Sequence, residues 1–136
     1  MGSRMGRSVV EIMRRDFVRT DVGESLESAR QTMRLGRLRH LLVTRGDTLV
    51  GLLSYRDLLE AMLGSERRAH PDSTVADAMR PAPLWVVAPD ASLGEAADCL
   101  CRYGLGCLPV TGLQGELLGL VTETDLLRAA YGLPRL

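Results

Sequence analysis

The sequence contains no lysine, so arginine supplies all 17 positive charges, and 17 acidic residues balance them. Without lysine the chain cannot form a Walker-type phosphate loop or a Schiff base with a carbonyl substrate. A neutral chain with interspersed charges also lacks the basic patch that is typical of proteins that bind nucleic acid. If the protein handles phosphate, we expect arginine, histidine and backbone amides to do so.

Aromatic residues are also scarce, at 4%, so the core must be built from Leu, Val, Ala and Met. No apolar run approaches the roughly 20 residues of a membrane-spanning helix, and no signal peptide precedes the first expected helix. The cysteines Cys99, Cys101 and Cys107 are odd in number and clustered, which suits a reducing compartment better than a disulfide scaffold. These features predict a cytoplasmic protein that contacts neither membrane nor nucleic acid.

Recognisable sets of catalytic or metal-binding residues are missing as well. Of the two histidines, His40 is the better candidate for a ligand contact, because His70 falls in a polar linker. Cys99 and Cys101 lie about 200° apart around a helix, so they cannot hold one metal from the same face, and we interpret them as small core residues. The pair Arg14-Arg15 is interpreted as a solvated turn. We therefore predict no enzymatic activity, no metal and no resident cofactor.

What the sequence does contain is an internal repeat with an offset of 66 to 68 residues. The phrase GLLSYRDLL, residues 51–59, returns as GLVTETDLL, residues 119–127. Other segments align in the same order: SVVEIM with TVADAM, SLESARQTM with SLGEAADCL, and HLLVT with CLPVT. A single repeat of about 60 residues would be marginally stable, whereas two repeats can bury their apolar sheet faces against each other.

Each repeat predicts a short helix, a short strand, an amphipathic helix, two strands joined by a turn, and a closing helix. The closing helices are expected to begin at Tyr55 and Glu123, and the turns to lie near Gly46 and Gly115. We expect the first repeat to span residues 8–63 and the second residues 74–132, with a linker at 64–73. Residues 1–7 are set aside as an N-terminal tail that resembles an expression remnant.

The Ser/Thr-x-x-Asp pattern at the start of each closing helix has two interpretations. Ser54 with Asp57, and Thr122 with Asp125, match a capping box, in which the two side chains satisfy free backbone amides. The capping box explains the hydroxyl better than the acid, because Glu or Gln is the usual partner. A helix N-terminus also suits phosphate, and a carboxylate on its first turn can accept both hydroxyls of a ribose. The pattern alone leaves both roles open.

The order of elements, with the Ser/Thr-x-x-Asp phrase closing it and RHLLV or CLPV in the middle, resembles the cystathionine-β-synthase (CBS) motif. Two copies over residues 8–132 resemble a stand-alone CBS domain pair, also called a Bateman module. The resemblance implies an α+β fold of the α/β type, with each motif β-α-β-β-α after a short helix. It also implies that the motifs pack sheet to sheet about a pseudo-twofold axis, and that the protein regulates something on another chain.

The resemblance further implies a sensor that binds AMP, ADP, ATP or S-adenosylmethionine in clefts between the two motifs. Asp57 and Asp125 would take ribose hydroxyls, beside Ser54 and Thr122. The segments that would border the base are Thr20, Asp21, Val22 and Val87, Ala88, Pro89. The residues that would lie near phosphate are Arg39, His40 and Arg56 in the first repeat, with Cys107 and Thr124 at the matching positions of the second.

The second repeat departs from the first at this basic rim. Gly106, Cys107 and Thr124 carry no charge, and Glu123 adds a negative one. We therefore expect the first repeat to bind a phosphorylated ligand more tightly than the second. A ligand-free dimerisation module remains the alternative. In either case we expect a homodimer, because the closing helices carry a wider apolar arc than one sheet face needs.

Overall fold

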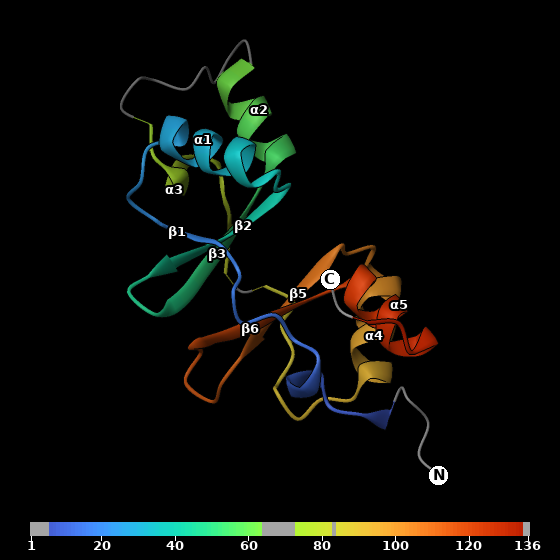
Figure 1. Cartoon of the computed structure of the whole chain (residues 1–136). Coiled ribbons are helices and arrows are strands. Elements are labelled where there is room, and N and C mark those ends of the chain that lie inside the picture. The colour runs from blue at the N-terminus through green and yellow to red at the C-terminus, as the bar shows by residue number, and fades with distance from the viewer. Residues whose placement is uncertain (1–5, 64–72, 83, 135–136) are drawn as a thin grey trace. The chain divides into compact units, whose positions relative to one another are not determined.

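The computed structural model of the chain describes residues 6–63, 73–82 and 84–134. His70, most of the expected linker and most of the expected tail lie outside the described residues. The helices and strands follow in this order (Figure 1): η2 Val9–Glu11, β1 Arg19–Asp21, α1 Leu26–Gly36, β2 His40–Arg45, β3 Thr48–Ser54, α2 Tyr55–Leu63, α3 Val75–Ala78, β4 Arg80–Pro81, α4 Leu93–Tyr103, β5 Cys107–Thr111, β6 Leu117–Thr122, α5 Glu123–Tyr131. The fold is therefore mixed α+β, as the sequence predicts, and α2 and α5 begin at the predicted residues.

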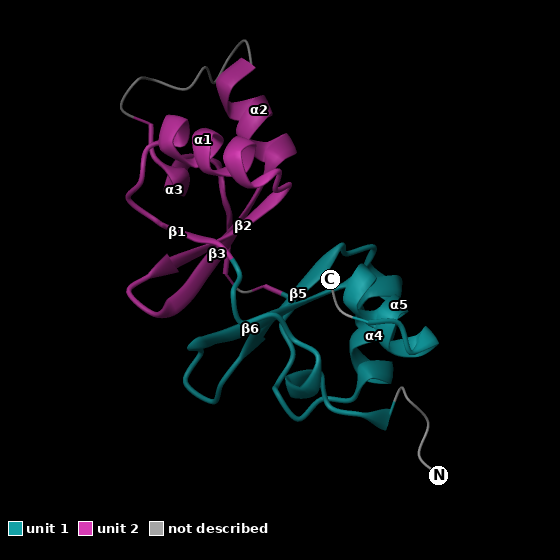
Figure 2. Ribbon diagram, viewed as in Figure 1, with its two compact units in different colours: residues 1–17, 85–136 teal, residues 18–84 magenta. Residues whose placement is uncertain are grey.

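The chain forms two compact units, and each unit contains parts of both repeats (Figure 2). Residues 18–84 form one, here called the first-repeat unit, and residues 1–17 with 85–136 form the second-repeat unit. The N-terminal arm of each repeat, which is η2 or α3 with the residues after it, therefore belongs to the unit of the other repeat. The alignment of the sequence with itself does not reveal this exchange of arms.

The first-repeat unit contains a four-stranded sheet in the order β1-β2-β3-β4. β1 runs parallel to β2, with Thr20 opposite Val43, and β2 and β3 form an antiparallel hairpin. The turn of this hairpin contains Gly46 at φ 62°, a backbone conformation that glycine adopts at little cost. β4 comes from the exchanged arm and places Arg80 opposite Leu52 of β3. Helices α1 and α2 lie side by side and pack on β2 and β3 (Figure 1).

The second-repeat unit repeats this plan with fewer regular strands. β5 and β6 form the antiparallel hairpin. A single parallel bridge between Val87 and Val110 takes the place of β1, and a single antiparallel bridge between Arg14 and Leu120 takes the place of β4. The predicted strand around residues 84–87 is thus reduced to one bridged residue. Pro89 follows closely and has no backbone N–H to donate to a longer ladder.

The two cores correspond to each other position by position. In the first-repeat unit the amphipathic helix buries Leu26, Ala29 and Met33, which are the positions that the helical spacing predicts. The second-repeat core is built in the same way, on Leu93, Ala96, Leu100, Leu108, Val110, Val121 and Leu126, with Val9 and Met13 from the exchanged arm. The repeat is therefore a repeat of buried positions as well as of sequence.

The glycine that opens each repeated phrase lies where the exchanged arm crosses the strand. A Cβ atom on Gly51 would lie 2.5 Å from the sulfur of Met79 and 2.7 Å from the carbonyl oxygen of the next residue. A Cβ atom on Gly119 would lie 2.6 Å from the sulfur of Met13 and 3.0 Å from the next carbonyl oxygen. Both approaches are closer than van der Waals contact permits, so the close passage of the arm requires glycine.

Candidate functional site

The first candidate site begins where β3 ends and α2 starts. The backbone N–H of Asp57 donates to Ser54 Oγ at 2.9 Å, so the hydroxyl half of the predicted capping box is present. Among the described residues, no hydrogen bond joins the Ser54 amide to the Asp57 carboxylate, which corrects the expectation of a complete box in this repeat. The Asp57 carboxylate lies near the guanidinium of Arg80, with Nε 3.9 Å from Oδ2.

The carboxylate of Asp57 is poorly satisfied. Its Oδ2 is buried and accepts no hydrogen bond from any described residue. The nearest cation is Arg80, whose Nε lies 3.9 Å from Oδ2, beyond hydrogen-bonding distance. A buried acceptor without a donor is uncommon in folded proteins and costs free energy. Asp57 therefore carries an acceptor that no described residue satisfies, and because 19% of the side chain is exposed, a small rotation would bring it to a donor from outside the protein.

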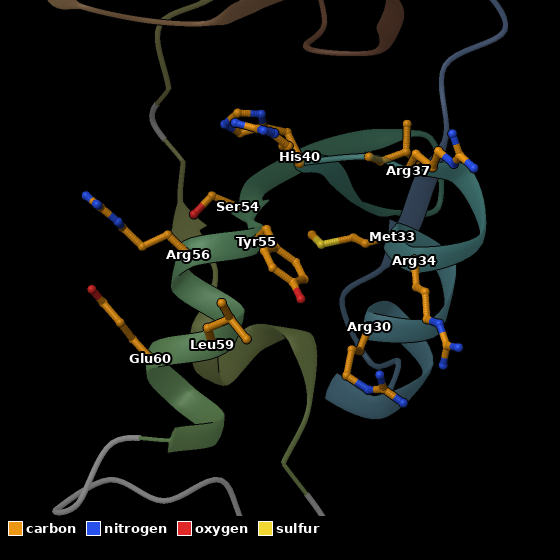
Figure 3. Close-up of a pocket in the computed structure, with 12 residues that line it drawn as sticks. Arg30, Met33, Arg34, Arg37, His40, Ser54, Tyr55, Arg56, Leu59 and Glu60 are labelled. Atoms are coloured by element: carbon orange, nitrogen blue, oxygen red, sulfur yellow. The ribbon is translucent and has the colours of Figure 1, made fainter.

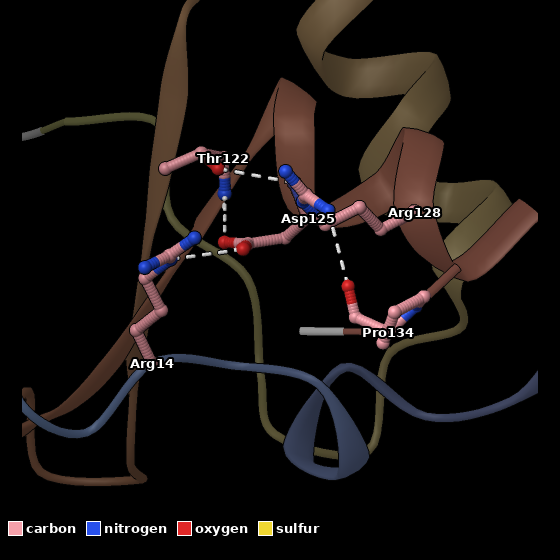
Figure 4. Close-up of polar contacts among 5 residues, drawn as sticks. All are labelled: Arg14, Thr122, Asp125, Arg128 and Pro134. Atoms are coloured by element: carbon pink, nitrogen blue, oxygen red, sulfur yellow. Dashed lines mark hydrogen bonds and ion pairs between the residues drawn. The ribbon is translucent and has the colours of Figure 1, made fainter. Parts of the chain in front are cut away.

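Both oxygens of the equivalent carboxylate in the second repeat accept a hydrogen bond (Figure 4). Asp125 Oδ1 accepts from Arg14 Nε at 2.9 Å, and Oδ2 accepts from the Thr122 amide at 3.0 Å. The Asp125 amide donates to Thr122 Oγ1 at 3.2 Å, which completes the capping box predicted here. Only 2% of the Asp125 side chain is exposed. Arg14 is therefore part of a buried ion pair, which corrects its interpretation as a solvated turn residue, whereas Arg15 is exposed.

A hollow of about 830 Å³ lies between α1 and α2 in the first-repeat unit (Figure 3). Its lining brings together four residues predicted from the sequence: Arg39, His40, Ser54 and Arg56. Figure 3 shows Met33 and Tyr55 between the two helices, with charged side chains along both rims. The start of α2 thus borders a space lined by cations through Tyr55 and Arg56, whereas Asp57 is not among the lining residues.

Three arginines of this rim were missed by the sequence analysis. Arg30, Arg34 and Arg37 project from α1 and the residue after it. Arg30 pairs with Glu27 at 2.6 Å, but among the described residues Arg34, Arg37, Arg39 and Arg56 form no ion pair. The dense run of basic residues between positions 34 and 40 could have indicated this rim. It was missed because the run lies at the end of a helix and is not part of a recognised motif.

Burial lowers the pKa of His40 below its ordinary value, and the carboxylate of Asp57 opposes part of that effect. The neighbouring guanidinium groups of Arg80 and Arg39 also lower it. His40 is therefore neutral near pH 7 in the free protein. An anion placed beside it would favour the protonated imidazolium, so ligand binding and proton uptake are expected to be coupled.

The residues predicted to border the base lie away from the described lining of this hollow. Thr20 is buried in β1, the Asp21 carboxylate accepts from the Gly23 amide at 2.8 Å, and the Val22 amide donates to the Thr44 carbonyl. In the second-repeat unit, the segment from Val87 to Pro89 bonds mainly through its backbone. Its carbonyl groups accept from neighbouring backbone amides, and the Val87 amide donates to the Pro109 carbonyl at 3.0 Å.

The matching positions of the second repeat carry no cation, although Arg7 and Arg128 line a separate hollow of about 200 Å³ beside Asp125. Cys107 occupies the position of His40, and burial raises the pKa of its thiol to about 11, so the thiol stays protonated and uncharged. Thr124 and Glu123 are exposed at the start of α5. The hollow between α4 and α5, about 380 Å³, is lined largely by apolar side chains. Cys101 borders it and is exposed, so its interpretation as a core residue is wrong, whereas Cys99 is partly buried against the core.

Within residues 6–63, 73–82 and 84–134, no group of three or more His, Cys, Asp or Glu side chains is arranged to hold a metal ion. None of the helices in this described part of the chain combines the length and apolar character needed to cross a membrane.

Among curated proteins, similarity extends over most of this chain but only part of each relative. The chain is 36% identical over 112 residues to inosine-5′-monophosphate dehydrogenase of Korarchaeum cryptofilum, covering 82% of this chain and 22% of that protein. It is 28% identical over 122 residues to an uncharacterized protein of Methanopyrus kandleri, covering 89% of this chain and 61% of the relative. The chain thus spans less than two thirds of the length of these relatives.

Solved structures match nearly the whole chain. CBSX2 in complex with AMP superposes with a TM-score of 0.81 at 28% identity, covering 93% of this chain and 98% of that one. CBSX2 from Arabidopsis thaliana was also solved separately, and it gives a TM-score of 0.80 at 26% identity, covering 93% and 96%. The cytosolic domain of the Mg²⁺ channel MgtE in complex with ATP gives 0.74 at 27% identity, covering 89% and 48%. The family model of the CBS domain matches residues 9–64 and 75–132, so this chain belongs to the CBS domain family and carries two CBS motifs in tandem.

Proposed function

We propose that the first repeat binds an adenosine-containing nucleotide at Asp57, and that this binding makes the protein a regulatory sensor. CBS pairs are regulatory rather than catalytic modules. Two similar structures hold nucleotides, AMP in CBSX2 and ATP in the MgtE cytosolic domain. In this proposal Asp57 accepts the ribose hydroxyls, and the phosphates lie toward Arg39, His40 and Arg56.

The observation that carries the proposal is the buried Oδ2 of Asp57, which accepts no hydrogen bond from the described residues and has only a long ion pair with Arg80 at 3.9 Å. An ionised carboxylate only accepts hydrogen bonds, and a ribose diol supplies two O–H donors close together. A hydrogen bond to a charged group contributes about 1.5–3 kcal/mol. The binding of a diol would therefore recover free energy that the free protein lacks, since Asp57 has no donor there.

The charge of the surrounding rim favours a phosphorylated ligand. Arg39 and Arg56 form no ion pair in the described chain, so neither must break a contact with an acid to meet phosphate. Arginine binds phosphate through two parallel N–H donors, which adds geometric specificity to the charge. The same rim opposes a cationic ligand, so we expect AMP, ADP or ATP to bind better than S-adenosylmethionine.

Isothermal titration calorimetry with these four ligands tests the proposal. We expect Asp57→Ala to weaken nucleotide binding by about tenfold to a hundredfold, the loss that corresponds to one charged hydrogen bond. Asp47→Ala is the matched control, because Asp47 lies in the exposed turn of the same unit and pairs only with Arg19 at 3.4 Å. Wild-type affinity in Asp57→Ala, or an equal loss in the control, would contradict the proposal.

We also propose that the chain forms a homodimer through the outer face of α5. Leu127 and Tyr131 of this helix and Leu133 just after it are large, apolar and exposed. They lie next to or just beyond the apolar hollow between α4 and α5, and such contiguous apolar surface is typical of protein contacts. The occupant proposed here is a second copy of the chain.

Sedimentation velocity across a concentration series tests this dimer. We expect Leu127→Gln to shift the protein toward monomer. Leu113→Gln is the control, because Leu113 is fully exposed in the β5–β6 turn, away from α5. A wild-type protein that stays monomeric at tens of micromolar would contradict the dimer and leave the nucleotide proposal untouched.

A further inference from the structure

Two arginines occupy the same position in the exchanged arms. Arg14 follows Met13 and bridges to Leu120, and Arg80 follows Met79 and pairs with Leu52. Each therefore enters the sheet directly beside the strand that leads to a Ser/Thr-x-x-Asp phrase. Their backbones are placed alike, so the difference between them lies in the side chains.

The two guanidinium groups meet their aspartates differently. Arg14 Nε lies 2.9 Å from Asp125 Oδ1, whereas Arg80 Nε lies 3.9 Å from Asp57 Oδ2. The Arg14 side chain is 33% exposed and that of Arg80 is 69% exposed. Arg14 thus makes a charge-assisted hydrogen bond in a largely buried setting, and Arg80 stays mostly in solvent.

The consequence for a ribose concerns access to the carboxylate. In the second repeat, Asp125 Oδ1 accepts from Arg14, Oδ2 accepts from the Thr122 amide, and only 2% of the side chain is exposed. Each oxygen keeps a second lone pair, but at this burial a diol could reach it only by displacing Arg14, which would leave the guanidinium partly buried without a partner. Breaking a buried ion pair on one side is strongly unfavourable, so the displacement is opposed.

We propose that Arg14 is the residue that closes the second repeat to ribose and limits the protein to one nucleotide per chain. This inference rests on the proposed nucleotide site at Asp57 for its chemistry. Arg14 acts as a specificity determinant from within the chain: it occupies the carboxylate that a ligand would need. Arg80 leaves the equivalent carboxylate open, and the number of sites follows from this difference.

The residues around Asp125 determine which ligand the second repeat would bind once Arg14 is replaced. Cys107 is protonated, Thr124 is uncharged and Glu123 is negative at the positions that surround phosphate in the first repeat. With Arg14 removed, Asp125 Oδ1 would be free while Oδ2 still accepts from the Thr122 amide, and Arg7 and Arg128 would remain in the hollow of about 200 Å³ that Asp125 borders. The ligand class that fits this carboxylate is a nucleoside bound through its diol, and adenosine is the simplest probe of it.

Calorimetric stoichiometry with AMP and adenosine tests the proposal in single and double variants. We expect the wild type to bind one AMP per chain and Asp57→Asn to bind it about tenfold to a hundredfold more weakly. We expect Arg14→Gln in the Asp57→Asn background to gain one adenosine site, and a further Asp125→Asn change to abolish it. Arg80→Gln in the same background is the matched control and should gain no second site. If Arg14→Gln is unfolded at the titration temperature, Arg14→Met replaces it, because methionine keeps most of the apolar part of the arginine side chain.

The outcomes separate this inference from the function on which it rests. Two sites per wild-type chain would overturn the role of Arg14 while the nucleotide site stands. The role of Arg14 would also be overturned if Asp57→Asn impairs AMP binding but neither folded Arg14 variant gains an adenosine site. The nucleotide site at Asp57 would still stand. If the wild type binds no AMP, the proposed function of the first repeat is wrong. If the Arg14 variants nevertheless gain one adenosine site, the proposal that Arg14 blocks the second repeat is supported.

Discussion

Asp57 and Asp125 stand at the same position of the two repeats, on the first turn of the closing helix. Asp125 is paired with Arg14 and completes a capping box, whereas Asp57 leaves one buried oxygen without a donor. The difference arises from the arm that crosses each sheet, since one arginine reaches its aspartate and the other stops 3.9 Å away. The comparison teaches that one residue in one fold position can be satisfied from within the chain in one repeat and left without a hydrogen bond in the other, where we propose that a ligand uses it.

The hollows between the paired helices show a second difference of the same kind. In the self-alignment, Arg30 and Arg34 of the first repeat correspond to Ala97 and Cys101 of the second. Both hollows occur in the same place, yet one has a cationic rim and the other is largely apolar. The fold therefore does not require the arginines, which is why we relate them to a ligand rather than to packing.

The largest expected effect is on stability. Asp57 is the aspartate that we propose for ligand binding, but we expect Asp125 to contribute more to the free energy of unfolding. Asp125→Ala removes a capping box and leaves Arg14 unpaired, and we expect a loss of about 2–3 kcal/mol in the free energy of unfolding. Asp57→Ala removes a poorly satisfied carboxylate, and we expect a change within about 0.5 kcal/mol. Chemical denaturation of both variants measures the difference. Equal losses would break the distinction drawn between the repeats.

Gly51 and Gly119 provide a test of a feature that both repeats share, which is the close crossing of the exchanged arm over the strand. We expect Gly51→Ala and Gly119→Ala each to cost about 1–3 kcal/mol, since the added Cβ overlaps the crossing arm. The loss should be larger at Gly51, where the carbonyl oxygen lies at 2.7 Å rather than 3.0 Å. Denaturation midpoints measure both values. A gain in stability, which is the usual effect of Gly→Ala in a relaxed strand, would show that the arm moves aside.

The ends of α1 and α4 offer a smaller contrast. Arg37 closes α1 with φ 52°, in the left-handed region, where Gly104 closes α4 with φ 64°. A side chain in this region costs about 1 kcal/mol, so we expect Arg37→Gly to raise the unfolding free energy by about that amount. Arg34→Gly is the control, because glycine within the helix should lower it by a similar amount. An unchanged melting temperature in Arg37→Gly would argue against strain at this position.

The smallest expected effect is the pH dependence of stability and AMP binding that His40 gives to the first repeat. Burial lowers the pKa of His40, so the unfolded chain binds the proton more readily and this residue's contribution to stability falls as pH drops through about 6.5. Phosphate should raise the same pKa, so AMP should bind severalfold more tightly near pH 6 than near pH 8. The phosphate group of AMP itself loses charge near pH 6, so His40→Gln supplies the reference titration. The same pH dependence in His40→Gln would exclude His40 from the site.

Local structure follows closely from local sequence in this chain. The positions of Leu26, Ala29 and Met33 predict the buried face of α1, and the Ser/Thr-x-x-Asp phrases predict where α2 and α5 begin. These predictions succeed because helical spacing and capping involve residues three or four apart. The cations Arg39, His40 and Arg56 were expected from the resemblance to the CBS motif, and the structure brings them to one hollow.

The use made of each aspartate was decided by tertiary structure alone. Arg14 and Asp125 are 111 residues apart, and nothing in their local sequence says that they meet. Their contact depends on the exchange of arms between the repeats, and a difference of 1.0 Å in the reach of an arginine separates a closed carboxylate from an open one. Sequence by itself determined two similar helix starts with an acid on each. Only the tertiary structure determined which acid is neutralised from within, because ion pairing depends on the distance between side chains in space rather than along the chain.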